Sequence, residues 1–294
     1  LNRAGLFANP VLVSTVNNGI PAFPNRTVFN FVIAAVEIDG KQLLLDATDK
    51  NAAPNILPMR DLNWTGRLIR PDATSEEIVL IPKNLSKETI NIVAKIADNG
   101  NASGKLKYTR TDYEALYFRK QHGGENQSQY LENLENKYDG LKVSDYASDL
   151  DNNTNKPITE SFTFATDNAS EMLDGKLYID PLLCYTMKKN PFVLEERKLP
   201  VYYGYPFQVK YNVSIEIPQG YTVESLPKPI KVVTGQDAFG TFTFNVSSAD
   251  NKIQIVSSHE INVANIQSHL YGSLKDYYKK MIDKQNEKII LKKL

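Results

Sequence analysis

The chain has 294 residues, of which 41% are hydrophobic, which is enough for two or three globular domains with buried cores. Thirty-four basic residues balance thirty-four acidic ones, so no net charge favours binding to nucleic acid or to an anionic membrane surface. A single cysteine excludes an internal disulfide framework, and no apolar run approaches the roughly 18 residues that a membrane-spanning helix needs.

The first predicted domain, residues 1–65, contains a β-hairpin. A strand is expected in PVLVSTV, followed by a loop at residues 17–26. The apolar runs FNFVIAAVEI and KQLLLDAT then flank Asp39-Gly40, a dipeptide that favours a two-residue turn because both positions tolerate positive φ. The sequence therefore predicts two paired strands around this turn.

The turn also sets which side chains share a face of the hairpin. With Asp39 and Gly40 as the loop, residue 33 faces residue 46 and residue 31 faces residue 48. Because side chains alternate along a strand, Phe31 and Asp46 lie on one face as diagonal neighbours. An imidazole at position 31 would reach the Asp46 carboxylate, but this chain has phenylalanine there.

The second predicted domain, residues 66–190, is a mixed α+β module. Alternating strands are expected in ETINIVAKIADNGNASGKLKYT, and helices in DYEALYFRKQ and NQSQYLENLENKY. Two further strands are expected near LKVSDYA and ESFTFAT.

The third predicted domain, residues 191–294, is an antiparallel β-sandwich that ends in a docked helix. Short strands alternate with the turn signals PQG, GQDAFG and SADN. Ile266, Leu270, Leu274, Tyr277 and Met281 recur every three or four residues and predict the apolar stripe of the helix. The final KIILKKL is interpreted as a solvated terminus.

The hairpin sequence FNFVIAAVEIDGKQLLLDATDK resembles the histidine-aspartate half of the transglutaminase-like core, which in bacterial members reads approximately Phe-Asn-His, an apolar strand, Asp-Gly-Lys and Leu-Asp-Ala-Thr-Asp. Segments such as NPFVLEERKLPVYYGYPF and IPQGYTVESLPKP are similar to the C-terminal portion of bacterial transglutaminase-like (cysteine protease-like) envelope proteins, a portion with no assigned function. The resemblance implies a periplasmic or cell-envelope location. It also implies a nucleophilic cysteine just upstream of a segment like LNRAGL, and we expect any export signal to be upstream or removed.

The departure at position 31 puts the family's chemistry in doubt. A cysteine nucleophile needs a base that takes up its proton, and an aspartate that orients this base. Phe31 can do neither, so the sequence predicts that Asp46 and Phe31 are vestigial positions of a pseudo-enzyme. Asp46 is then expected to cap a turn or bind backbone amides through Thr48, although another residue or a second chain could complete a site.

The remaining candidates have structural interpretations. Cys184 lies in the apolar YIDPLLCYTM without a basic neighbour, so a buried thiol is expected. His122, His259 and His269 have no partner at metal-ligand spacing, so neither a metal site nor a cofactor is predicted.

The segment RKLPVYYGYPF offers two interpretations. Tyr203 and Tyr205 could form an aromatic platform for sugars or for a protein partner, since tyrosine combines an apolar face with a polar tip. Alternatively, these side chains pack inward at the start of a strand.

The sequence thus predicts an α+β, mainly β protein: a partial transglutaminase-like core, then β-sandwich-type modules and a C-terminal docked helix. The predicted function is a non-catalytic structural or interaction portion of an envelope protein, with a protein or glycan as partner. Two alternatives stay open: a thiol-dependent acyl transferase or peptidase whose cysteine lies upstream, and a carbohydrate-binding module.

Overall fold

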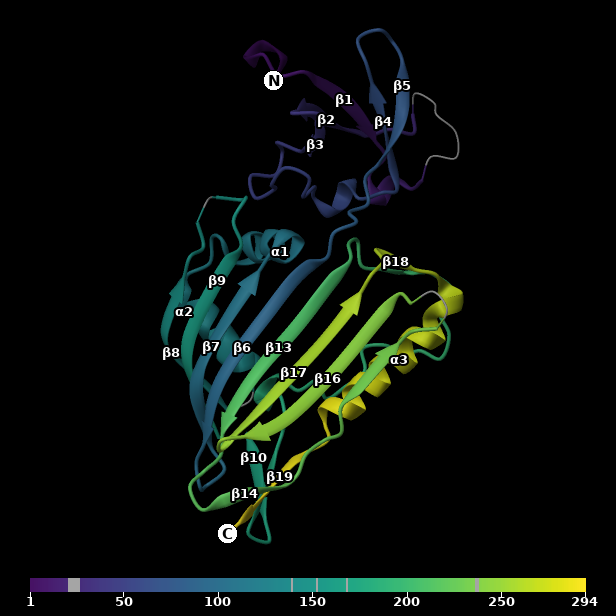
Figure 1. The fold of residues 1–294 in the computed structure, drawn as a ribbon. Helices are drawn as coiled ribbons and strands as arrows, with labels where there is room; N and C mark the ends of the chain where they lie inside the picture. Colours follow the sequence, from purple (N-terminus) through teal and green to yellow (C-terminus); the bar gives the residue numbers. More distant parts are fainter. Residues whose placement is uncertain (21–26, 139, 152, 168, 236–237) are drawn as a thin grey trace.

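Two sheet-based units follow one another along the chain (Figure 1). This computed structural model describes residues 1–20, 27–138, 140–151, 153–167, 169–235 and 238–294. Parts of the predicted loop at 17–26 and of the predicted turn at 235–240 therefore lie outside the described residues. The architecture is mainly β with a few helices, which confirms the predicted fold class.

The N-terminal unit is a five-stranded sheet in the order β3-β2-β1-β4-β5. Its strands are β1 (Ala8–Val13), β2 (Phe31–Ile38), β3 (Lys41–Leu45), β4 (Thr65–Ile69) and β5 (Ser75–Val79). The last two strands extend this unit beyond residue 65, where the sequence placed the end of the first domain.

The β2–β3 hairpin has the predicted register. Pairing runs from Ile38 opposite Lys41 to Ala34 opposite Leu45, and Asp39 and Gly40 form the turn with φ values of 51° and 71°. Both central positions have positive φ, as a type I′ turn requires.

The second unit is built on an eight-stranded sheet in the order β15-β16-β17-β13-β6-β7-β9-β8. Its strands are β6 (Ser86–Ile96), β7 (Ala102–Arg110), β8 (Leu141–Ser148), β9 (Ile158–Thr166), β13 (Phe207–Glu216), β15 (Ile230–Val233), β16 (Gly240–Ala249) and β17 (Lys252–Ile261). Figure 1 shows these strands as one broad, twisted layer below the N-terminal unit.

One pairing in this sheet is parallel. Strands β13 and β6 pair over ten residues, from Phe207 opposite Ser86 to Glu216 opposite Lys95, whereas the other pairings are antiparallel. The pairings among β13, β15, β16 and β17 of the predicted third domain are antiparallel, as expected, and the parallel pair joins them to β6. The parallel pair also places strands of the predicted second and third domains in one sheet. The division of the chain at residue 190 stays a prediction.

Helices and a small sheet cover one face of the large sheet. These elements are α1 (Asp112–His122), α2 (Gln127–Lys137), α3 (Tyr271–Gln285), and the four-stranded sheet of β10 (Ser170–Leu173), β11 (Lys176–Ile179), β19 (Ile289–Lys293) and β14 (Tyr221–Ser225). The described residues also contain the short pair β12 (Val201–Tyr202) and β18 (Asn265–Ile266) and five 3-10 turns: Asn2–Ala4, Val16–Asn18, Met59–Asp61, Leu183–Tyr185 and Ser268–Leu270. Among the described residues, no helix combines the length and the apolar character needed to cross a bilayer.

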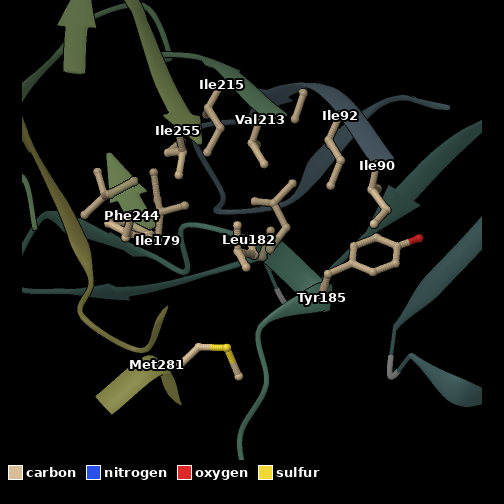
Figure 2. Packing of buried hydrophobic residues seen from close by; sticks show 14 of the residues in the cluster. Ile90, Ile92, Ile179, Leu182, Tyr185, Val213, Ile215, Phe244, Ile255 and Met281 are labelled. Carbon is tan, nitrogen blue, oxygen red and sulfur yellow. The ribbon is translucent and has the colours of Figure 1, made fainter. Parts of the chain in front are cut away.

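The main core lies between the large sheet and this cover. Figure 2 shows its aliphatic part, where Ile92, Ile215 and Ile255 of the sheet face Leu182 and Met281 of the cover. The predicted stripe of the C-terminal helix is buried at Leu274, Tyr277 and Met281, while Ile266 and Leu270 precede the helix.

The C-terminal segment differs from its expectation. Residues 289–293 form β19, which lies between β11 and β14, with Ile289 and Leu291 fully buried. The sequence KIILKKL was read as a solvated end because its lysines mask an alternating strand pattern.

Candidate functional site

Asp46 stands directly after β3, and its carboxylate is buried. Its side chain is 1% exposed, and its Oδ1 accepts hydrogen bonds from the Thr48 backbone N–H at 2.9 Å and from the Thr48 hydroxyl at 2.7 Å. These bonds are those of an aspartate that closes a turn through its own backbone two residues later. The predicted role of Asp46 in closing a turn through Thr48 therefore describes the interactions of Oδ1.

The other carboxylate oxygen is taken by an arginine. Arg60, in the 3-10 turn Met59–Asp61, donates from Nη2 to Asp46 Oδ2 and to the Thr48 hydroxyl. The same guanidinium carbon lies 4.8 Å from the centre of the Phe31 ring. Phe31 and Asp46 therefore lie on the same side of the hairpin, as predicted, and Arg60 contacts both.

A second buried carboxyl group adjoins this pair. Asp61 is completely buried, and its Oδ1 lies 3.6 Å from Arg60 Nε. Burial, together with the neighbouring Asp46, raises the pKa of Asp61 to about 7. Burial also acts to raise the pKa of Asp46, but hydrogen bonds from Thr48 and Arg60 and the adjacent Asp61 carboxyl group outweigh it and hold that pKa below its ordinary value.

A third carboxylate connects this group to the second unit. Asp49 Oδ2 forms an ion pair with Lys120 Nζ of α1, and the two atoms are 2.7 Å apart. This cluster thus contains three carboxyl groups and two cations: Asp46, Asp49, Asp61, Arg60 and Lys120. With Asp61 protonated, its charges balance.

The described residues bring no thiol and no imidazole to this cluster. Cys184 is partly buried against the core of the large sheet, where burial raises the pKa of its thiol to about 12, so the thiol is less enclosed than the sequence predicted. The three histidines also belong to the second unit, and burial lowers the pKa of His259 to about 4. No group of three or more potential metal ligands occurs in the part of the chain that the structure describes.

The two candidate platform tyrosines pack inward. Tyr205 is 9% exposed and stacks on Tyr113, with ring centres 4.5 Å apart. The Tyr203 hydroxyl lies 3.4 Å from the hydroxyl of Tyr278 in α3, and its ring contacts Phe207. Neither ring forms part of an open aromatic surface, because each packs against another element. This packing removes the main argument for a sugar platform at these positions.

Sequence reasoning identified Asp46 and Phe31 but not Arg60 or Asp61. The latter two lie in a loop, where no periodic pattern indicates which side chains point inward. The available signal was the adjacent pair Arg-Asp after Pro58, between two predicted strands, in a segment otherwise rich in apolar residues.

Comparisons with known proteins describe part of the chain. A family model for a domain of unknown function with a solved structure, DUF3858, matches residues 175–291, which is less than half of the chain. A crystal structure from Parabacteroides distasonis ATCC 8503, of a protein assigned only provisionally as a protease, aligns with 99% of this chain at 11% identity and a TM-score of 0.49. The chain spans 41% of that protein's length. No curated protein matched.

Proposed function

We propose that this chain is a non-catalytic structural or interaction portion of a cell-envelope protein with a transglutaminase-like N-terminal unit. The observation that supports this most strongly is the position of Arg60, which pairs with Asp46 and covers Phe31. In the family that the hairpin resembles, this space belongs to an imidazole that transfers protons.

The chemistry of the residues present supports the proposal. A guanidinium has a pKa above about 12 and carries no lone pair that can accept a proton at neutral pH. Phe31 has no ionisable group. Asp46 therefore has no base to orient, and its carboxylate instead fixes the loop between β3 and β4 to the end of the hairpin through Thr48 and Arg60.

A comparison of three variants tests the role of Arg60. In Phe31→His, Arg60 still holds Asp46 and places a positive charge beside the new imidazole, so we expect a histidine pKa below its ordinary value of about 6.5. In Phe31→His with Arg60→Met, the imidazole gains Asp46 as its partner, and we expect a pKa above that value. Arg60→Met alone serves as the folding control. The pKa is measured from the pH dependence of the histidine ring signals by NMR.

Two results would overturn the proposal. Equal histidine pKa values in the single and double variants would show that Arg60 does not occupy the position of the base. Hydrolysis or transfer of amide substrates by a chain extended upstream to include a cysteine, abolished by iodoacetamide, would establish the alternative of a thiol-dependent enzyme. A chain extended upstream to include any cysteine-bearing helix should be inactive while Phe31 and Arg60 are in place.

A further inference from the structure

The covered face of the large sheet changes character along its strands. Toward β10 and β19 its side chains are aliphatic or aromatic, as Figure 2 shows for Ile92, Ile215 and Ile255. Toward α1 the same face becomes polar, with inward-facing residues from five strands: Glu88, Arg110, Glu160, Tyr211 and His259. A closed core has no need of this polar half, because buried polar groups are costly unless they are paired.

Two adjoining hollows lie over the polar half. One, of about 280 Å³, lies beneath α1 and α2, and the other, of about 220 Å³, extends toward α3. They share Glu88, Lys137, Tyr138, Tyr185 and Tyr211 and therefore form one depression, called the tyrosine groove below. Six tyrosines line it: Tyr108, Tyr117, Tyr130, Tyr138, Tyr185 and Tyr211.

Two cations of the chain line the groove, the exposed Lys137 and the buried Arg110. Arg110 pairs with Glu88, Nε to Oε1 at 2.8 Å, and with Glu160. Its guanidinium carbon lies 4.4 Å from the Tyr108 ring centre and 4.3 Å from that of Phe118. Aromatic faces and carboxylates thus stabilise a positive charge here.

Glu114 of α1 lines the same groove and has no ion-pair partner among the described residues. It accepts only a hydrogen bond from the Tyr205 hydroxyl at 3.2 Å. Burial and the nearby Glu88 raise the pKa of Glu114 to about 7. This region thus contains three carboxyl groups, Glu88, Glu114 and Glu160, of which only Glu88 and Glu160 pair with Arg110.

A buried hydroxyl is also unsatisfied. Tyr185 is 8% exposed and lines both hollows, and its hydroxyl lies beside that of Tyr108 without forming a hydrogen bond of ordinary geometry with it or with any other described residue. Figure 2 shows this hydroxyl pointing away from Leu182 and Met281. A buried polar atom without a partner indicates a position for a bound group.

We propose that the tyrosine groove binds the primary ammonium group of a ligand, with Glu114 as its counter-charge, and that the ligand is a lysine side chain of a peptide segment. The aliphatic stem of lysine would pack on tyrosine rings, while its three N–H donors would meet the free carboxylate and a hydroxyl acceptor. A neutral sugar would leave Glu114 without a counter-charge, and an anion would be repelled by Glu88 and Glu114. The other charged groups nearby do not supply the missing cation: Lys137 is exposed over the Tyr138 ring, and His122 pairs with Glu125. This inference is independent of Asp46 and Arg60.

The test compares two peptides that differ by one charge. NMR shifts of the chain are followed at pH 8, where Glu114 is ionised, during titration with N-acetyl-Gly-Lys-Gly-amide or with the same peptide carrying Nε-acetyl-lysine. We expect at least about tenfold tighter binding of the charged peptide, with the largest shifts at residues of the groove. Glu114→Gln keeps an acceptor for Tyr205 and should remove most of this difference. Glu132→Gln, at an exposed position of α2, should leave it unchanged.

The comparison in the unmodified chain decides the proposal even if a variant fails to fold. Equal binding of the two peptides would overturn it, as would the absence of shifts in the groove up to tens of millimolar peptide. Stronger binding of a neutral oligosaccharide such as cellotriose would assign the groove to sugars instead.

Discussion

Arg60 is the cation that makes two buried carboxyl groups tolerable at the end of the N-terminal hairpin. Removing one member of a buried ion pair leaves the other charge uncompensated, which costs more than losing a surface pair. Because the Arg60 side chain is 40% exposed, we expect Arg60→Met to lower the free energy of unfolding by about 1–3 kcal/mol, less than for a fully buried pair. Urea denaturation measures this. Arg70→Met, which breaks the exposed pair with Glu76, should cost less than about 1 kcal/mol, and equal losses would contradict this account.

Asp61 gives the protein a defined pH dependence. Its pKa is about 7 in the folded state and about 4 when unfolded, so between these values the folded state retains a proton that the unfolded state has lost. Stability should therefore decrease as the pH rises from about 4 to about 7, by at most about 1.4 kcal/mol per pH unit for this group. Glu114, with a pKa also raised to about 7, contributes a slope of the same sign.

The variant Asp61→Asn separates the two contributions. It cannot ionise, so we expect thermal melts between pH 4 and 7 to show a shallower decrease in stability than the parent chain. The Glu114 contribution that remains is offset up to about pH 6.5 by His259, whose lowered pKa makes stability rise with pH. Asp46 acts in the opposite direction, because its pKa is lowered and its stabilisation is lost below about pH 4. An unchanged slope in Asp61→Asn would show that Asp61 is ionised in the folded protein.

At the scale of single elements, Gly104 of β7 permits the close pairing of β7 with β6. A Cβ atom at this position would clash with the backbone carbonyl oxygen of Val93 and would lie 2.9 Å from the Ala94 Cα. Backbone atoms of a central strand cannot move aside, so Gly104→Ala should lower the free energy of unfolding by about 2 kcal/mol or more. The control is Gly124→Ala, where nothing lies within 4 Å. Similar melting temperatures for the two variants would refute this reason for the glycine.

The elements also show what the sequence could and could not predict. The register of the β2–β3 hairpin follows from a two-residue turn, which is a local property, and this register correctly placed Phe31 on the same side as Asp46. Arg60 reaches the pair from a loop fourteen residues after Asp46, and no local rule determines how such a loop folds back. The parallel pairing of β6 with β13 joins residues more than 100 positions apart, so the strands were recognised but their partners were not.

The groove illustrates the same limit for function. Its tyrosines come from β7, β13, α1, α2, the residue after α2 and the 3-10 turn Leu183–Tyr185. Each of them fits an ordinary packing pattern in its own segment of the sequence. The sequence analysis instead selected Tyr203 and Tyr205 as a candidate binding surface because they are close together in the sequence. Both pack inward. Only the sheet order brings the separated tyrosines to one depression.

At the scale of the whole molecule, the parallel β6–β13 pair makes the second unit depend on both halves of the chain. The DUF3858 match covers residues 175–291, which contain β13 but not β6. A fragment of residues 175–294 would expose ten residues of β13 with unpaired backbone groups, and would also lack the buried side chains of β6, β7 and β9. We therefore expect this fragment to melt without a cooperative transition, or to aggregate, in circular dichroism and size-exclusion experiments.

A matched fragment shows whether the missing strands are the cause. Residues 80–294 keep all eight strands of the large sheet and lose only the five-stranded sheet, so this fragment should unfold cooperatively, at a lower temperature than the full chain because Tyr113 and Leu116 become exposed. Co-expression of residues 1–174 with 175–294 should restore a soluble complex, since β6 and β13 can then pair. A cooperative transition of 175–294 alone, within a few degrees of that of 80–294, would show instead that the family's matched region is an independent folding unit.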